Sequence, residues 1–93
     1  MNHYENVVIS NANLSNEDYE KLKKQIENII KKYGKLENAE EKGTKRLAYE
    51  IQNQNKGTYT IFEFSSKHEL IDELERFYRL KDDVLKFIIV KKD

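Results

Sequence analysis

The side chains that most often carry metal or redox chemistry are scarce in this sequence. Its only histidines, His3 and His68, fall in different predicted elements, and neither has other ligand-type residues at metal-binding spacing. The absence of cysteine excludes a disulfide framework, a thiolate nucleophile and a cysteine zinc site. We therefore expect no metal and no other cofactor.

Nucleophiles and paired carboxylates are present, but without the partners that catalysis requires. No general base is spaced to serve any of the four serines, which are Ser10, Ser15, Ser65 and Ser66. The carboxylate pairs Glu40-Glu41 and Asp82-Asp83 are adjacent in sequence, so in a strand or turn their side chains point apart. The three glycines are isolated and form no phosphate-binding loop. The sequence therefore predicts neither an enzyme nor a small-molecule substrate.

Length and charge narrow the class of protein further. Ninety-three residues are enough for one modest core, so we expect a single domain over residues 1–93. Seventeen Lys and Arg balance seventeen Asp and Glu, so any basic surface must be local. No apolar run approaches the roughly 20 residues of a membrane span, and the first residues do not resemble a signal peptide. A soluble cytoplasmic protein without membrane contact is expected.

The first half of the chain predicts a strand and a helix that would position these side chains. Tyr4 to Ser10 is β-branched and predicts a strand. Apolar residues then recur at helical spacing to Tyr33, with Ser15 as a plausible N-cap. Gly34 stands where a left-handed residue would end the helix.

The second half predicts two strands, a helix and a last strand. The expected segments are an extended stretch 35–52 bent at Gly43, a turn at 53–57, a strand at 58–64, a helix capped by Ser66, and a strand at 84–90. The order is βαββαβ, which predicts an α+β, ferredoxin-like fold: a four-stranded antiparallel sheet with both helices on one face.

One face of such a sheet stays uncovered by its own chain. Alternation along the third strand places Phe62 and Phe64 on one side and Tyr59 and Ile61 on the other. We expect the phenylalanines to meet the helices and the other two to face outward. Exposed apolar residues on the open face would mark an interaction surface.

The RNA-recognition motif has the same element order and stacks bases on aromatic residues of its two central strands. Here threonine occupies both stacking positions of the third strand, and Val8 stands where the first strand should carry an aromatic residue. This signal is weak. A basic surface could still form if folding gathered Lys42, Lys45, Arg46, Lys86, Lys91 and Lys92.

A more specific pattern begins at Lys45. The string from Lys45 to Ile51, KRLAYEI, resembles the basic-Arg-Leu-Ala-Tyr-Pro-Ile signature of the sixth protein of the bacterial small ribosomal subunit. The Tyr4-Glu5 start, the Glu41-Lys42-Gly43 step and the ending from Leu74 to Lys91 are similar too. Glu50 replaces the usual proline, so we expect more regular pairing of the second strand there. Lys86 replaces a usual arginine.

The resemblance implies a structural RNA-binding protein of the 30S subunit, without catalysis. Family members join the subunit's eighteenth protein as a heterodimer and bind the central domain of the small-subunit ribosomal RNA. The protein interface would then include Tyr49, Tyr59 and Ile61. The residues expected to approach RNA are His3, Tyr4, Lys45, Arg46, Arg79, Lys86, Lys91 and Lys92.

Other functions occur on the same fold. A ferredoxin-like regulatory dimer that binds a small molecule would need a ligand loop, typically glycine-rich, after the first strand, where this chain has Asn11-Ala12-Asn13-Leu14. An acylphosphatase-type enzyme would need an arginine in that loop, and the first arginine is Arg46. A self-associating module without RNA would present the same open face. Fold alone does not choose among these functions, whereas the string at Lys45 favours the ribosomal one.

Overall fold

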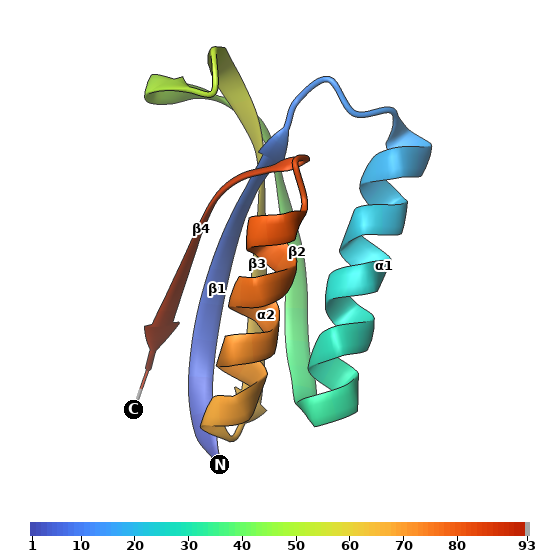
Figure 1. Ribbon diagram of the computed structural model, residues 1–93, viewed down its shortest axis with the longest axis vertical. Helices are drawn as coiled ribbons and strands as arrows, with labels where there is room; N and C mark the ends of the chain where they lie inside the picture. The colour runs from blue at the N-terminus through green and yellow to red at the C-terminus, as the bar shows by residue number, and fades with distance from the viewer. Residues whose placement is uncertain (93) are drawn as a thin grey trace.

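The chain, described here over residues 1–92 by a computed structural model, folds in the predicted βαββαβ order (Figure 1). The elements are β1 (Asn2–Asn11), α1 (Asn16–Tyr33), β2 (Gly34–Ile51), β3 (Gln54–Ser66), α2 (His68–Leu80) and β4 (Val84–Lys91). None of the helices in this part of the chain is long and apolar enough to cross a membrane.

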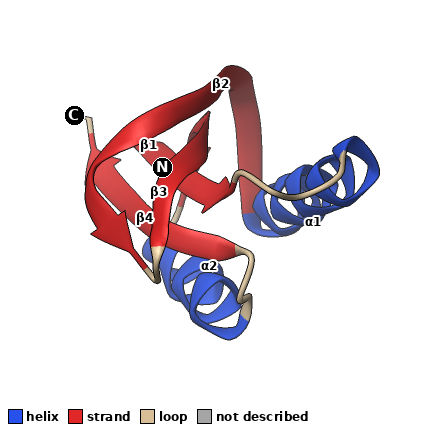
Figure 2. Cartoon of the chain, turned by 90° about the horizontal axis from the view of Figure 1, so that it is seen from above, coloured by secondary structure: helices blue, strands red, loops and turns tan. Residues whose placement is uncertain are grey.

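The four strands form one sheet in the order β2-β3-β1-β4, and every neighbouring pair is antiparallel. Both helices lie on the same side of that sheet, as the view from above shows (Figure 2). The ferredoxin-like prediction is confirmed. Where they pair with each other, the two central strands, β1 and β3, therefore carry a helix-covered face and an open face.

The core lies between the helices and the covered face. Val8 of β1 and Phe62 and Phe64 of β3 are almost fully buried there, against Leu22, Ile26, Ile30, Leu70 and Leu74 of the helices. Because side chains alternate along a strand, Tyr59 and Ile61 point to the open face. Both side assignments predicted for β3 are confirmed.

A buried polar link ties helix α2 to the sheet. The Tyr78 hydroxyl donates a hydrogen bond to Asn6 Oδ1, and Asn6 Nδ2 donates to the Ile88 carbonyl at 3.0 Å. Burial raises the pKa of Tyr78, so its hydroxyl keeps its proton. Tyr78 therefore links α2 to β1 through a hydrogen bond, and Asn6 links β1 to β4 through a second one.

The two ends of helix α1 differ in how well the sequence predicts them. Ser15 is the N-cap, and its Oγ accepts a hydrogen bond from the Asp18 N–H at 3.1 Å. The left-handed prediction for Gly34 is wrong, since this residue is extended and already begins β2. Gly34 pairs with Ser66 of β3, and glycine is needed at this position because a Cβ would come within 2.5 Å of the Ser65 carbonyl oxygen.

The β2–β3 turn is shorter than the sequence suggests. Gln52 and Asn53 both have positive φ, and they alone separate Ile51 from its partner Gln54. Two residues of this kind form the tight turn that matches the twist of a hairpin. The predicted turn over residues 53–57 is therefore too long, and Gly57 lies inside β3.

Ser66 does not cap helix α2 as expected. It is the last residue of β3, and its hydroxyl donates to the Lys67 carbonyl at 2.9 Å. The N-cap is Lys67, whose side chain makes no capping hydrogen bond. Strand β3 pairs with both neighbours as far as Ser66, which delays the start of the helix.

We predict that Tyr78→Phe destabilises the protein by about 1 to 3 kcal/mol, because Asn6 Oδ1 would lose its donor inside the core. Urea denaturation measures the change, and Tyr33→Phe, on an exposed tyrosine, is the matched control with little expected effect. In an Asn6→Ala background the cost of Tyr78→Phe should shrink. An equal cost in both backgrounds would show that the link contributes nothing.

Candidate functional site

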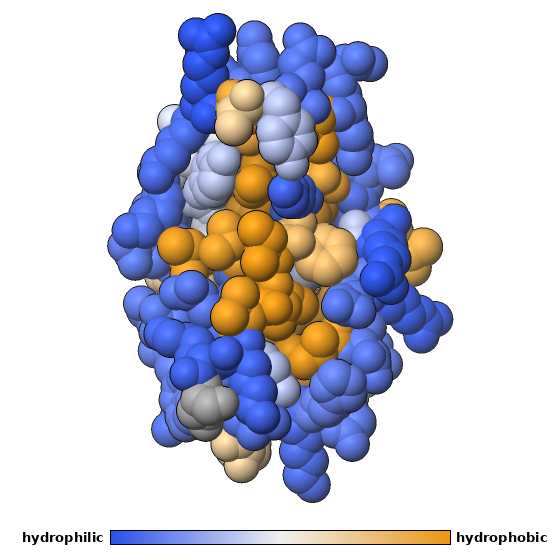
Figure 3. Space-filling view, turned by 90° about the vertical axis from the view of Figure 1, so that its left-hand side faces the viewer, coloured by the Kyte–Doolittle hydropathy of each residue, from blue (hydrophilic) through white to orange (hydrophobic). Residues whose placement is uncertain are grey.

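The open face of the sheet carries a continuous apolar surface. Near its upper end is a groove of about 230 Å³, lined by Val7, Ile9, Leu47, Ala48, Tyr49, Ile51, Tyr59, Lys86 and Ile88. Apolar side chains run from it along β4, where Ile88 is 44% exposed and Val90 is 50% exposed. Seen from the side of β4, hydrophobic atoms form one patch framed by hydrophilic ones (Figure 3). Such a patch on a small protein marks a binding surface.

The β2–β3 hairpin supplies one wall of the groove. Residues 47–50 of β2 face only Asn55 on β3, because Arg46 pairs with Lys56 and Ile51 with Gln54. Extra residues on one strand increase its bend, and the hairpin tip leans away from the helices (Figure 1). The more regular pairing expected beside Glu50 is therefore wrong.

A second bend lies lower on the same strand. The register of β2 against β3 shifts between Glu41 and Gly43, and Gly43 has a φ of 84°. This is the left-handed region that glycine tolerates best, so the bend predicted at Gly43 is confirmed. Together the two irregularities turn the long strand over the open face.

Gly57 makes the base of the groove possible. Leu47 lies in a small cluster with Ile9 and Leu85, separate from the main core. A Cβ on Gly57 would overlap the Ile9 side chain and come within 3.3 Å of Leu47. The missing side chain at Gly57 therefore lets the curled strand pack against β1.

Two lysines cover tyrosines of the open face. Lys45 Nζ lies 5.5 Å from the centre of the Tyr59 ring. Lys86 Nζ lies 5.4 Å from the Tyr49 ring centre and donates a hydrogen bond to the Tyr49 hydroxyl at 2.8 Å. A cation over an aromatic face is attracted to it, while its stem covers apolar surface. The structure thus brings two predicted RNA residues beside two predicted interface residues.

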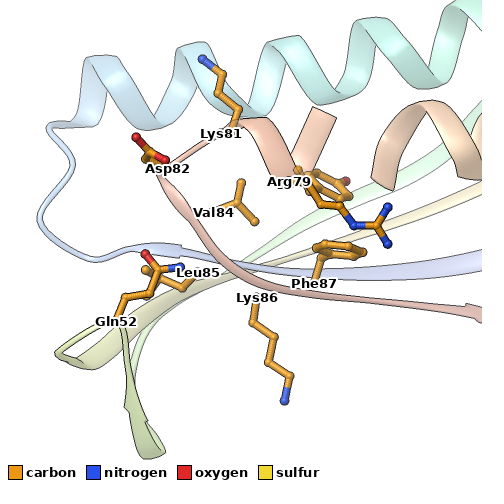
Figure 4. Close-up of a pocket in the computed structure, with 9 residues that line it drawn as sticks. Gln52, Arg79, Lys81, Asp82, Val84, Leu85, Lys86 and Phe87 are labelled. Atoms are coloured by element: carbon orange, nitrogen blue, oxygen red, sulfur yellow. The ribbon is translucent and has the colours of Figure 1, made fainter. Parts of the chain in front are cut away.

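The other predicted RNA residues do not join this group. Arg79 lies beside Glu75 at 3.7 Å on the exposed side of α2. A cavity of about 360 Å³ separates the end of α2 from β4, but Arg79, Lys81 and Lys86 point away from one another around it (Figure 4). It is therefore not a ready-made anion site.

The remaining predicted cations lie elsewhere. Lys91 and Lys92 are at the far end of β4, beside Tyr4 and His3 of β1. Arg46 is exposed on the hairpin, opposite Lys56. The predicted RNA residues are therefore spread along the molecule rather than gathered in one place.

Tyr4 has a structural role that its prediction as an RNA residue did not foresee. Only 6% of it is exposed, and its ring stacks on Phe64 with the centres 5.5 Å apart. The ring is committed to the core and offers no free face to a base. The structure thus gives no support to Tyr4 as an RNA contact.

His3, Ser65 and Glu37 lie together at the lower end of the open face. Ser65 Oγ is 3.0 Å and Glu37 Oε1 is 3.3 Å from the same atom, His3 Nδ1. Hydrogen bonds from Ser65 and then His3 hold the pKa of Glu37 below its ordinary value. A catalytic relay needs the serine and the carboxylate on opposite ring nitrogens, so this trio lacks that geometry. Within residues 1–92 no group of three or more potential ligands could hold a metal ion.

Comparison with known proteins identifies the family. The model of a family described as Ribosomal protein S6 matches residues 3–91. The chain belongs to the ribosomal protein S6 family. It is 37% identical over 91 residues to the small ribosomal subunit protein bS6 of Alkaliphilus oremlandii, covering 98% of this chain and 97% of that one. The bS6 protein of Helicobacter pylori strain P12 is 38% identical, and 65% of its length is covered.

The fold agrees with this assignment. The crystal structure of 30S ribosomal protein S6 from Thermotoga maritima superposes with a TM-score of 0.93 at 30% identity, covering 98% of this chain and 87% of that one. Members of the family are structural proteins of the small ribosomal subunit and not enzymes. Family membership therefore favours the ribosomal hypothesis over the regulatory dimer.

Gly57→Ala should distort the groove and destabilise the protein by about 1 to 3 kcal/mol, since the new methyl group overlaps Ile9. Methyl NMR shifts of Ile9 and Leu47, together with urea denaturation, report the change. The comparison variant is Gly43→Ala, where a Cβ meets no atom within 4 Å and only backbone strain is added. If the Ile9 and Leu47 signals move no more in Gly57→Ala than in Gly43→Ala, the proposed role of Gly57 is wrong.

Proposed function

We propose that this protein forms a heterodimer with the eighteenth protein of the small ribosomal subunit, and that the pair binds the central domain of the small-subunit ribosomal RNA. All of residues 1–93 would act as one domain in this assembly. The observation that carries the proposal is the open sheet face, with an apolar groove bordered by two lysines, in a chain that matches the S6 family over residues 3–91.

The protein part of the proposal rests on the apolar residues of this face. Tyr49 is 60% exposed on the hairpin, and Tyr59 and Ile61 lie beside the groove and its continuation. Interfaces between proteins are enriched in tyrosine at their centres, where pockets take side chains of the partner. Burial of this surface would provide the main driving force for the heterodimer.

The RNA part rests on basic residues spread along the molecule, most of them on the hairpin and on β4. Affinity for RNA depends on lysine and arginine near phosphates, and a chain of zero formal net charge has few to spare. A basic partner would supply the rest. The candidates in this chain are His3, Lys45, Arg46, Arg79, Lys86, Lys91 and Lys92.

A titration of a central-domain ribosomal RNA fragment tests the proposal. The protein is added with and without the eighteenth protein, at two salt concentrations. We expect tight, salt-sensitive binding only when both proteins are present, because the partner contributes charge. Absence of RNA binding by a mixture of two folded proteins would contradict the assignment.

Removing charge at the signature string should weaken the RNA complex. Lys45→Gln together with Arg46→Gln is expected to lower RNA affinity of the protein pair and to reduce the salt slope by about 1 for each lost phosphate contact. Glutamine keeps a long side chain over Tyr59, so packing changes little. The matched control is Lys21→Gln with Lys24→Gln on the exposed side of α1. An unchanged salt slope in the signature variant would remove these two residues from the RNA surface.

A further inference from the structure

The open face changes character along its length. At the hairpin end, Lys86 faces Ile9 across the strands and belongs to the groove. The next row toward the other end is apolar, with Val7 between Ile61 and Ile88. The row after that joins Glu63 of β3 directly to Glu5 of β1. From the groove the surface thus runs from cationic through apolar to acidic, and the row beyond the two glutamates joins Ser65 to His3 and ends beside Lys92.

The acidic row places two like charges opposite each other. Glu5 lies between the core residues Tyr4 and Asn6, and Glu63 between Phe62 and Phe64, so both carboxylates point to the open face. Directly opposed residues have Cβ atoms about 4.5 to 5.5 Å apart, and like charges at that distance are destabilising. Both residues are partly buried, which reduces screening by salt.

Within residues 1–92 no ion pair joins either of these two carboxylates, Glu5 and Glu63, to a cation. Carboxylates on β2 have cationic partners: Glu40 lies 2.7 Å from Lys42, and Glu41 lies 2.7 Å from Lys23. Two carboxylates opposed as Glu5 and Glu63 are, without such a partner, are expected to repel each other and to lower the stability of the isolated protein.

We infer that the open face binds an extended, basic segment of the protein partner, with an apolar side chain in the groove and a lysine or arginine over Glu5 and Glu63. The inference rests on the proposed heterodimer and specifies its chemistry. Successive rows on one face are about 7 Å apart, so the acidic row lies about 14 Å from the Lys86 row. Two residues about four positions apart in an extended segment span that distance.

Charge complementarity selects a protein rather than RNA for this part of the face. Phosphates brought against Glu5 and Glu63 would add a third negative charge to the pair, whereas a guanidinium can donate to both carboxylates. Val90, 50% exposed opposite Glu5, extends the apolar strip to the same point. The two carboxylates set the direction, because they attract the basic end of the segment.

The test measures stability and partner binding in the same variants. With Glu5→Gln and Glu63→Gln combined, we expect a midpoint of thermal unfolding about 2 to 5 °C higher, since the repulsion is removed. Affinity for the eighteenth protein should fall by about tenfold, with a weaker dependence on salt. Glu5→Lys should also raise stability, by pairing with Glu63, and should weaken partner binding further.

The control removes two charges from the helices, which cover the other face. Glu20→Gln with Glu73→Gln is expected to leave partner affinity unchanged. Higher stability of the Glu5 and Glu63 variants with unaltered partner affinity would overturn the inference while leaving the heterodimer in place. Tighter RNA binding by Glu5→Lys without the partner would overturn it in favour of RNA on this face. Failure of the wild-type protein to bind the partner would overturn the proposed heterodimer, and this inference with it.

Discussion

Alternation along the two central strands is the constraint on which the rest of the structure depends. Each residue of β1 or β3 that enters the core fixes its neighbours on the opposite side, and the chain has helices for one side only. Phe62 and Phe64 are therefore inseparable from an outward-facing Glu63, and Tyr4 and Asn6 from an outward-facing Glu5. A shift of one residue would bury those carboxylates, so the requirements of the core keep them on the surface.

The same constraint explains where the protein would bind its partners. A flat sheet face would have no pocket for a partner's side chain. The long β2–β3 hairpin creates one by curving over the open face. Residues 47–50 leave the regular ladder, and Gly57 lets Leu47 settle against Ile9. The signature string from Lys45 to Ile51 thus has a structural role, because it forms one wall of the groove. Its lysine, stacked over Tyr59, is carried to the groove by that shape.

The sequence predicts the fold well because the apolar period of 3.6 residues is clear in both helices and β-branched and aromatic residues mark the strands β1, β3 and β4. Alternation groups Phe62 with Phe64 and Tyr59 with Ile61, and the expected orientation of the two groups is confirmed, although periodicity alone does not decide which group meets the helices. Prediction from the sequence fails where contacts distant in sequence decide the conformation. Gly34 is extended because it pairs with Ser66 of β3, and Ser66 stays in β3 because both neighbouring strands pair that far. Tyr4, predicted to approach RNA, is held in the core by Phe64, a neighbour that only the strand register reveals.

The formal net charge of the chain is zero, but cationic and acidic side chains occupy separate regions of the open face. Opposed Glu5 and Glu63 could be relieved by a single substitution, and natural proteins retain destabilising groups mostly where function uses them. A carboxylate pair that lowers the stability of the free protein strengthens binding of a cation. The cation removes the repulsion between the carboxylates and is itself attracted to both of them. The gain on binding is then larger than for a pair already neutralised within the chain. In a small, marginally stable protein, repulsion that is present in the free state and relieved in the complex therefore adds to the free energy of binding.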